Sequence, residues 1–278
     1  MYFTNKVFLL LSCKMPIIVI GDISISFPFD PYSVQRVFLS RLLSALNSCS
    51  NALLESPTGT GKTICLLCGA LSWQKAYPAS REHKPRILYA SRTHSQLSQV
   101  VAELKCATDY SDVNAVVLGS RDQLCVHQTV SKETNAASKI QSCRLKVKTR
   151  SCVHYNAWDK QQNSLSKDKS HVVDIEDLVK EGKRGQAGVC PYFSAKSLAA
   201  TADLVLLPYN YLLDRKARST HGINLENAVI IFDEAHNIER LCEEAASFQL
   251  TSAQLASAFV ETQTLLKHIV VRLFSLNY

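Results

Sequence analysis

The stretch "SPTGTGKT", residues 56–63, has the residue types and spacing of a loop that holds phosphate groups. Its glycines let backbone N–H groups turn toward phosphate oxygens, and a helix that starts there adds partial positive charge. Lys62 would reach the β- and γ-phosphates, and the Thr63 hydroxyl would bind Mg²⁺. A chance glycine-rich turn is the weaker alternative, although Ser56 replaces the first glycine of the strict pattern. The predicted ATP-binding residues are Ser56, Pro57, Thr58, Gly59, Thr60, Gly61, Lys62 and Thr63.

A second motif, "VIIFDEAHN" at residues 229–237, carries two acids directly after an apolar run. Asp233 could hold Mg²⁺ through water, and Glu234 could orient and deprotonate an attacking water. His236 is placed to sense the γ-phosphate. On its own, the motif could be a solvated helix start, where acids are favoured. Together with the phosphate loop it predicts an ATP–Mg²⁺ site in which Lys62, Asp233, Glu234 and His236 are catalytic.

Short apolar runs predict the strands that must position these motifs. Such runs are typical of strands buried on both faces of a parallel sheet. Helical patterns lie between some of them: residues 62–73 are apolar nearly all round, and residues 96–105 place apolar side chains on one face. This alternation predicts an α/β fold. The predicted strands are residues 52–55, 87–90, 115–118, 204–207 and 229–232.

Each predicted strand is followed by a polar motif. In open parallel sheets, ligands bind outside the carboxyl ends of the strands. The sequence therefore predicts that the five motifs lie along one edge of the sheet. They are "SPTGTGKT", "SRTH" (residues 91–94), "GSR" (119–121), "PYNY" (208–211) and "DEAH" (233–236).

Residues 121–192 break the alternation, and we interpret them as an insertion into the α/β domain. They hold four cysteines, many charges and a polar loop at residues 159–170. The segment "CRLKVKTRSC", residues 143–152, could be a disulfide loop, a metal site or a basic strip for nucleic acid. The intervals of 18, 9 and 38 residues between the four cysteines fit no compact zinc pattern. The one CxxC pair, Cys65 and Cys68, is interpreted as small core residues of a buried helix.

Composition narrows the class of protein. The 278 residues carry a net charge of +7, which suits a polyanionic partner without requiring one. The apolar residues 7–13 are short and no clear cleavage site follows, so no secretory signal is predicted. No run approaches the roughly 20 apolar residues of a membrane span. We therefore expect a reducing compartment, which disfavours a Cys143–Cys152 disulfide.

The motifs together resemble the superfamily 2 iron–sulfur DNA helicases of the xeroderma pigmentosum group D type. Within that family, "DIEDLVKEG" (residues 174–182) and "CEEAASFQLTSAQLAS" (242–257) are most similar to the branch that regulates telomere elongation. The resemblance spans about residues 15–261. The motifs that carry it are "FPFDPYSVQ" (27–35), "SPTGTGKT", "ASRTHSQL" (90–97), "GSRDQLC" (119–125), "CPYF" (190–193), "PYNYLLD" (208–214) and "DEAHN".

The resemblance implies roles for further residues. Gln35 would read the adenine of ATP, and four cysteines would hold a [4Fe–4S] cluster; a Cys₄ zinc site is the alternative. The arginines could instead be solvated surface charges, which their positions at strand ends disfavour. For the two tyrosines, ordinary core packing competes equally with stacking on bases. The implied cluster ligands are Cys125, Cys143, Cys152 and Cys190. The implied contacts with single-stranded DNA are Arg92, Thr93, His94, Arg121, Tyr209, Asn210 and Tyr211.

The resemblance also implies a domain plan. Residues 15–120 and 193–250 would form a RecA-like ATP-binding domain, interrupted by an iron–sulfur domain at residues 121–192. Residues 1–14 would be an extension and residues 251–278 a truncated helical tail. If the loop of residues 143–152 is held at both ends by cluster ligands, its four basic residues could line the path of a single strand. Those residues are Arg144, Lys146, Lys148 and Arg150.

The implied function is the motor half of an ATP-dependent 5′–3′ DNA helicase in repair, recombination and telomere maintenance. Its partners would be single-stranded DNA and DNA junctions; we expect a nuclear monomer with no membrane contact. The family's second RecA-like domain, which supplies an arginine to ATP, does not follow His236 in these residues. We therefore expect weak ATP–Mg²⁺ binding, slow hydrolysis and no unwinding by this chain alone. A non-catalytic DNA-binding or interaction fragment remains the alternative.

Overall fold

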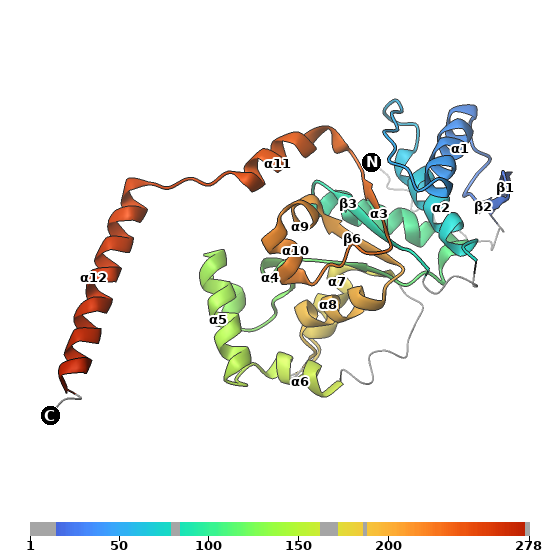
Figure 1. The fold of residues 1–278 in the computed structure, drawn as a ribbon. Coiled ribbons are helices and arrows are strands. Elements are labelled where there is room, and N and C mark those ends of the chain that lie inside the picture. The colour runs from blue at the N-terminus through green and yellow to red at the C-terminus, as the bar shows by residue number, and fades with distance from the viewer. Residues whose placement is uncertain (1–14, 79–83, 162–171, 186–187, 276–278) are drawn as a thin grey trace, which may run out of the picture. The chain divides into compact units, whose positions relative to one another are not determined.

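The computed structural model describes residues 15–78, 84–161, 172–185 and 188–275. Five strands form a parallel sheet in the order β5–β4–β6–β3–β7 (Figure 1). The predicted α/β class is therefore confirmed. The predicted extension at residues 1–14 and most of the predicted polar loop at residues 159–170 lie outside the described residues. The strands of the sheet are β3 (Arg86–Ser91), β4 (Ala115–Val117), β5 (Val172–Val173), β6 (Leu204–Pro208) and β7 (Ala228–Phe232).

Four of the five predicted strands are confirmed, as β3, β4, β6 and β7. The predicted strand at residues 52–55 is wrong: this segment forms no regular element, and Leu53 is 94% exposed. A short apolar run shows that a strand is possible, but a strand also needs a hydrogen-bonding neighbour, which the run does not reveal. The phosphate loop is therefore followed by a helix, as predicted, but not preceded by a strand.

Helices flank the sheet, and two further strands, β1 (Ile17–Ile20) and β2 (Ile23–Ser26), form a separate antiparallel pair. The described part also has short 3₁₀ turns at Thr108–Tyr110, Val130–Lys132 and Ala235–Asn237. The α-helices are α1 (Ser33–Asn47), α2 (Lys62–Lys75), α3 (His94–Cys106), α4 (Arg121–Leu124), α5 (Ala136–Lys148), α6 (Val153–Gln161), α7 (Ile175–Gly182), α8 (Pro191–Thr201), α9 (Tyr209–Leu213), α10 (Arg215–His221), α11 (Ile238–Ala246) and α12 (Ser252–Ser275).

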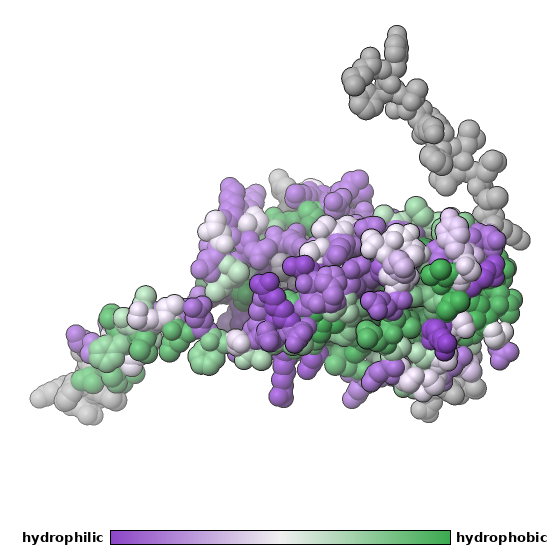
Figure 2. All heavy atoms as spheres, turned by 90° about the horizontal axis from the view of Figure 1, so that it is seen from above, coloured by the Kyte–Doolittle hydropathy of each residue, from purple (hydrophilic) through white to green (hydrophobic). Residues whose placement is uncertain are grey.

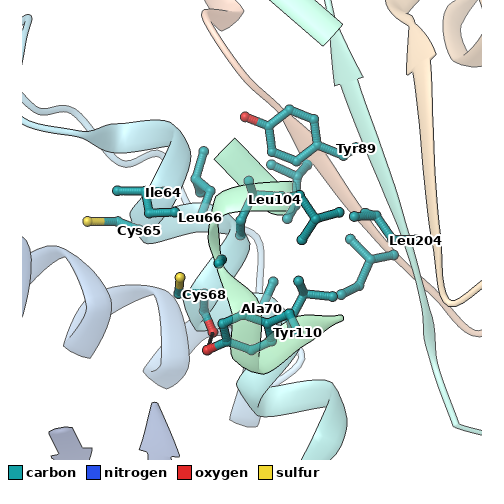
Figure 3. Packing of buried hydrophobic residues seen from close by; sticks show 14 of the residues in the cluster. Ile64, Cys65, Leu66, Cys68, Ala70, Tyr89, Leu104, Tyr110 and Leu204 are labelled. Atoms are coloured by element: carbon teal, nitrogen blue, oxygen red, sulfur yellow. Dashed lines mark hydrogen bonds between the residues drawn. The ribbon is translucent and has the colours of Figure 1, made fainter. Parts of the chain in front are cut away.

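The two faces of the sheet are covered by different helices because side chains alternate along each strand. On one face, Tyr89 and Leu204 pack in a core cluster with residues of α1, α2 and α3 (Figure 3). Helix α3 contributes the apolar stripe that the sequence predicted, and α2 is buried almost all round. On the other face, α8 and α9 lie close to β4, β6 and β3. Burial on both faces explains the continuous apolar runs.

Residues 121–192 are mostly helical, from α4 to the start of α8. One element was not foreseen: β5 pairs in parallel with β4 and belongs to the main sheet. The expected loop at residues 143–152 is also wrong, because α5 continues through Lys148. Lys, Arg and Leu are good helix formers, and the chain turns out of the helix only at Arg150, where φ is +55°.

Residues 238–278 form a second compact unit. Helix α12 lies within the residues predicted to form a helical tail, and hydrophobic residues are exposed along it (Figure 2). Phe259 and Leu266 are among them. Figure 2 also shows hydrophilic residues over much of the viewed face of the first unit. No helix among the described residues combines the length and the hydropathy that a membrane span requires.

Candidate active site

The phosphate loop follows the unpaired segment at residues 52–55 and ends where α2 begins at Lys62. Gly59 and Gly61 have φ values of +80° and +73°, in the left-handed region that only glycine adopts without strain. Inside the loop, the Ser56 and Thr60 hydroxyl oxygens lie 2.7 Å apart, and the Thr60 hydroxyl donates to the Pro57 carbonyl at 2.8 Å. These bonds hold the loop in a closed turn at the start of the helix.

Lys62 points back into this loop. Its ammonium donates to the carbonyl oxygens of Ser56 at 3.2 Å and Pro57 at 3.4 Å. The same ammonium lies 3.9 Å from Oε1 of Glu234. The Lys62 ammonium thus lies between the loop carbonyls and the Glu234 carboxylate. Its positive charge would stabilise a nucleotide phosphate bound at the loop.

Glu234 is the second residue after β7 and joins the two motifs. Its second carboxylate oxygen lies 3.5 Å from Nδ1 of His236. Its backbone φ is +58°, an uncommon value for a residue with a side chain, which turns the chain sharply at the end of the strand. The structure thus brings Lys62, Glu234 and His236 together, although 171 residues separate the first two along the sequence.

Asp233 is buried and held by neighbours on one strand, β3, and one helix, α9. The Tyr89 hydroxyl donates to its Oδ2 at 2.7 Å, and the Tyr209 hydroxyl donates to its backbone carbonyl. Its own N–H donates to the carbonyl of Ala90 on β3 at 3.0 Å. Burial, and then the negative charge of Asp233, raise the pKa of Tyr89 well above its ordinary value. Tyr89 therefore remains a hydrogen-bond donor to the carboxylate at neutral pH.

Gln35 is 2% exposed and contacts the phosphate loop. Its amide nitrogen donates to the carbonyl of Thr60 at 2.9 Å, and its amide oxygen accepts from the N–H of Tyr32 at 3.0 Å. A Cβ at Gly61 would lie 2.9 Å from the amide nitrogen of Gln35, so the close approach requires glycine. A surface hollow beside this contact is lined by Ser33, Val34, Val37, Phe38, Arg41, Leu54, Glu55 and Ser56.

The four cysteines of the inserted region line one cavity. Cys125 follows α4, Cys143 lies on α5, Cys152 precedes α6, and Cys190 precedes α8. Four segments separated along the chain therefore bring their thiols to one place. Aromatic and basic side chains complete the wall, including Arg121, His127, Lys146, His154, Tyr155 and Tyr192.

The chemistry of these thiols fits a site for a cationic group. Burial, with smaller contributions from the neighbouring thiols Cys152 and Cys125, raises the pKa of Cys190 to about 12. Burial and the nearby Cys143 and Cys152 also raise the pKa of Cys125. Thiolates crowded in this way would be stabilised by bound metal, which needs deprotonated sulfur. Among the described residues, no three His, Cys, Asp or Glu side chains converge closely enough to hold a metal ion as they stand.

The CxxC pair lies elsewhere. Cys65 and Cys68 are 1% and 0% exposed on α2, within the core cluster (Figure 3). Burial raises the pKa of both thiols to about 12. Their interpretation as core residues is confirmed.

Three of the residues predicted to contact DNA have exposed side chains. Arg92 and Thr93 follow β3, and Asn210 lies near the start of α9. The Thr93 hydroxyl also accepts from the N–H of Gln96 at 3.3 Å, which caps α3. His94 is half-buried with no partner for its Nδ1, and burial lowers its pKa.

The other three face inward. Tyr209 is 1% exposed, and Tyr211, at 6%, stacks on His221 with ring centroids 3.9 Å apart. Packed in this way, neither ring offers a face to a base. The guanidinium of Arg121 lies 4.1 Å from the centroid of the Tyr192 ring, at the cysteine cavity. The predicted contacts therefore divide into an exposed group and a packed group.

Sequence analysis missed Tyr89. It lies within the continuous apolar run of β3, where an aromatic ring is expected to be core. The only signal in the sequence was that Tyr89 carries a hydroxyl group on a predicted strand. The carboxyl end of that strand was expected at the same edge of the sheet as "DEAH". That signal became meaningful only when β3 and β7 proved to be neighbours.

Comparisons with known proteins agree with this arrangement. The DEAD_2 family model matches residues 89–255. The chain is 40% identical over 290 residues to "Regulator of telomere elongation helicase 1 homolog" of Drosophila mojavensis, covering 91% of this chain and 28% of that protein. It is 42% identical over 279 residues to "Regulator of telomere elongation helicase 1" of Bos taurus, covering 87% and 22%. The chain thus spans less than a third of the length of these relatives.

Two solved structures share the fold. "XPD_Helicase" has a TM-score of 0.52 at 21% identity and matches 77% of this chain and 34% of its own. "Truncated XPD" has a TM-score of 0.50 at 22% identity and matches 74% and 53%. The family match covers more than half of the chain and includes most of the sheet and the "DEAH" motif. The chain belongs to the DEAD_2 family, and it shares its fold with the two solved XPD structures.

Proposed function

We propose that this chain is the ATP-binding motor half of a 5′–3′ DNA helicase. The observation that carries the proposal is the meeting of Lys62 with Glu234, because it joins the phosphate loop to the acidic motif at the end of β7. Membership in a helicase family supports ATP and Mg²⁺ as the cofactors. Lys62 would bind the β- and γ-phosphates, while Thr63 and Asp233 would hold the metal ion. Glu234 would then take a proton from the attacking water, with His236 oriented beside it.

Gln35 would couple the bound base to the loop. Its amide already bonds to the backbone of the phosphate loop at Thr60 and to the chain before α1 at Tyr32. Recognition of adenine in the adjoining hollow would therefore affect the loop that holds the phosphates. This role remains a proposal that rests on position.

We also propose that Cys125, Cys143, Cys152 and Cys190 hold a [4Fe–4S] cluster. Their shared cavity supports it, and so do the raised pKa values of the Cys125 and Cys190 thiols. The cluster would supply cross-links among four segments of the inserted region and a charged group in its interior. A zinc ion on the same four thiols is the competing assignment.

The nucleic acid would be single-stranded DNA, including strands at junctions. Exposed Arg92, Thr93 and Asn210 lie at the carboxyl end of the sheet, beside the ATP site, where a strand could contact the backbone and side chains. The names of the relatives support a role in telomere maintenance. We further propose roles in repair and recombination, in the nucleus. We propose that the chain acts as a monomer.

A second candidate is a DNA-binding fragment with little turnover. The described residues contain one five-stranded sheet, and hydrolysis in related motors uses an arginine from elsewhere that is worth about 10³–10⁵ in rate in GTPases. This candidate keeps the cysteine site and the exposed DNA contacts. It predicts nucleotide binding with slow hydrolysis.

The test uses the purified 278-residue chain with ATP, Mg²⁺ and single-stranded DNA. Mg²⁺-dependent ATP binding that is lost in Lys62→Ala would support the ATP site. DNA-stimulated hydrolysis that is lost in Glu234→Gln would support the motor over the low-turnover fragment. Hydrolysis indifferent to both substitutions would refute the proposed site, and robust unwinding would show that this chain suffices as a helicase.

A further inference from the structure

Tyr89 places a hydroxyl group between two residues of the ATP site. Its ring is 0% exposed and packs in the core cluster with Leu104 and Leu204, whereas its hydroxyl oxygen points away from both (Figure 3). The hydroxyl donates to Oδ2 of Asp233 at 2.7 Å. This is a fully enclosed tyrosine whose one polar atom reaches the acid at the end of the neighbouring strand.

The sheet register explains the contact. β3 and β7 are parallel neighbours in which Tyr89 pairs with Ile231, so Asp233 comes two residues farther along β7. The N–H of Asp233 donates to the carbonyl of Ala90, which extends the strand pairing as far as the acid. Backbone and side chain of Asp233 are thus both fixed from β3.

Thr63 completes the arrangement. A hydrogen bond from Thr63 lowers the pKa of Tyr89, against the larger raising effects of burial and of Asp233. A tyrosine hydroxyl has one proton to donate and lone pairs with which to accept. Tyr89 thus donates to Asp233 at the end of β7 and has Thr63, in the first turn of α2, beside it.

We propose that Tyr89 is a positioning residue for the magnesium ion: it orients the Asp233 carboxylate and sets the spacing between Asp233 and Thr63 before the nucleotide arrives. This inference rests on the proposed ATP site. A site whose ligands are already held loses less freedom when the ion binds, so metal affinity is gained without an additional ligand. Tyr89 touches neither metal nor nucleotide in this role and acts only through Asp233 and Thr63.

A purely structural role predicts a different outcome. A buried hydroxyl needs a partner, and any acceptor at that place would satisfy it. If the bond only satisfied the hydroxyl, its removal would lower stability and leave the metal requirement unchanged. The Mg²⁺ dependence of nucleotide binding therefore separates the two roles.

The test compares Tyr89→Phe with Tyr110→Phe in the full 278-residue chain. Tyr110 is a matched control because it is 2% exposed and its hydroxyl donates to the carbonyl of Ser26, away from the acids. A fluorescent ATP analogue is titrated at fixed concentration with Mg²⁺. For Tyr89→Phe, we expect the half-saturating Mg²⁺ concentration to rise on the order of tenfold. Tyr110→Phe is expected to have the half-saturating Mg²⁺ concentration of the wild type, even if the substitution lowers its thermal midpoint of unfolding.

Equal Mg²⁺ requirements in Tyr89→Phe and wild type would overturn the role of Tyr89, and so would an equal rise in Tyr110→Phe. Absence of Mg²⁺-dependent binding in the wild type would instead overturn the proposed ATP site. A second measurement needs no variant: assigned ring signals of Tyr89 in the wild type should shift when Mg²⁺ is added to the nucleotide complex, while those of Tyr110 stay in place. Unmoved Tyr89 signals would also overturn the proposal.

Discussion

The ammonium of Lys62 lies 3.9 Å from the carboxylate of Glu234, and it also donates to two carbonyls of its own loop. The lysine side chain is 24% exposed and that of Glu234 is 41% exposed, so solvent screens this pair. Its importance is geometric. It places the cation of the phosphate loop beside the acid that would activate water, and a nucleotide phosphate would have to displace part of this contact.

Lys62→Ala should weaken nucleotide binding without affecting DNA binding. A hydrogen bond to a charged group contributes about 1.5–3 kcal/mol, so the affinity for ATP should fall roughly tenfold or more. Fluorescence titration with an ATP analogue measures the affinity for nucleotide. Fluorescence anisotropy with labelled single-stranded DNA measures the affinity for DNA. Lys75→Ala is the control, because Lys75 ends the same helix and pairs with Asp112 at the surface. Unaltered ATP affinity in Lys62→Ala would contradict the assignment of the loop.

Serine in place of Cys125 or Cys190 should remove bound iron and the visible absorbance of the purified protein. Each change takes one thiol from the shared cavity, so the cluster would lose a ligand. Cys65→Ala should keep the iron and lower the free energy of unfolding by about 1 kcal/mol, because that thiol packs only in the core. Metal analysis decides the result: zinc in the wild type would establish the alternative ion, and iron retained by both serine variants would count against these ligands.

Neutralising Arg144, Lys146 and Lys148 should flatten the salt dependence of DNA binding. These three lie on the last turns of α5, whereas Arg150 is already paired with Asp159 at 2.6 Å. For single strands the slope of log affinity against log salt changes by about 0.7 per phosphate contact, so the triple variant should lose up to about two units of slope.

The matched control for this variant neutralises Lys75, Lys84 and Lys105, which pair with acids at other places on the surface. Iron content must be measured in parallel, because Lys146 also lines the cysteine cavity. Equal slopes in the α5 variant and the wild type would mean that these charges form only a solvated face.

The folded protein should lose stability on acidification because of His221. Burial, with the nearby charges of Lys196 and Arg121, lowers the pKa of His221 from 6.5 to about 4. In the unfolded chain the imidazole takes up its proton at higher pH, so the stabilisation is complete above about pH 6.5 and is lost as the pH falls toward 4.

His221→Phe should keep the stack on Tyr211 and reduce the pH dependence of stability in this window. Urea unfolding at pH 7 and at pH 4.5 measures the effect for both proteins. His268→Gln, an exposed position on α12, serves as the control and should retain the wild-type dependence. A His221→Phe protein as acid-sensitive as the wild type would show that another group is responsible.

Much of the fold could be predicted from local patterns. The runs that became β3, β4, β6 and β7 are continuously apolar because both faces of the sheet are covered, and α3 shows its buried stripe directly in the sequence. The run at residues 52–55 is apolar like the runs that form these strands, but it forms no strand itself. Pairing depends on a neighbour that is remote in the chain, and the two-residue strand β5 was missed for the same reason.

The chemical groups of the candidate site follow from the sequence alone. "SPTGTGKT" and "DEAH" contain the lysine, hydroxyl and acids of an ATP site, and four cysteines stand out in a region without alternation. These conclusions depend on residue type and short spacing, which any single sequence displays. The placement along one edge of the four motifs that follow β3, β4, β6 and β7 also followed, because parallel strands align their carboxyl ends.

Only the tertiary structure decided which side chains meet. In the folded chain Tyr209 and Tyr211 are buried, whereas Arg92, Thr93 and Asn210 are exposed. All five belong to polar motifs that follow strands, so the motifs alone did not distinguish them. The tertiary structure also brought Tyr89 to Asp233 through the pairing of β3 with β7, and it gathered the thiols of Cys125 and its three partners from four segments. Contacts between distant residues depend on strand order and register, which local patterns of apolar and polar residues do not contain.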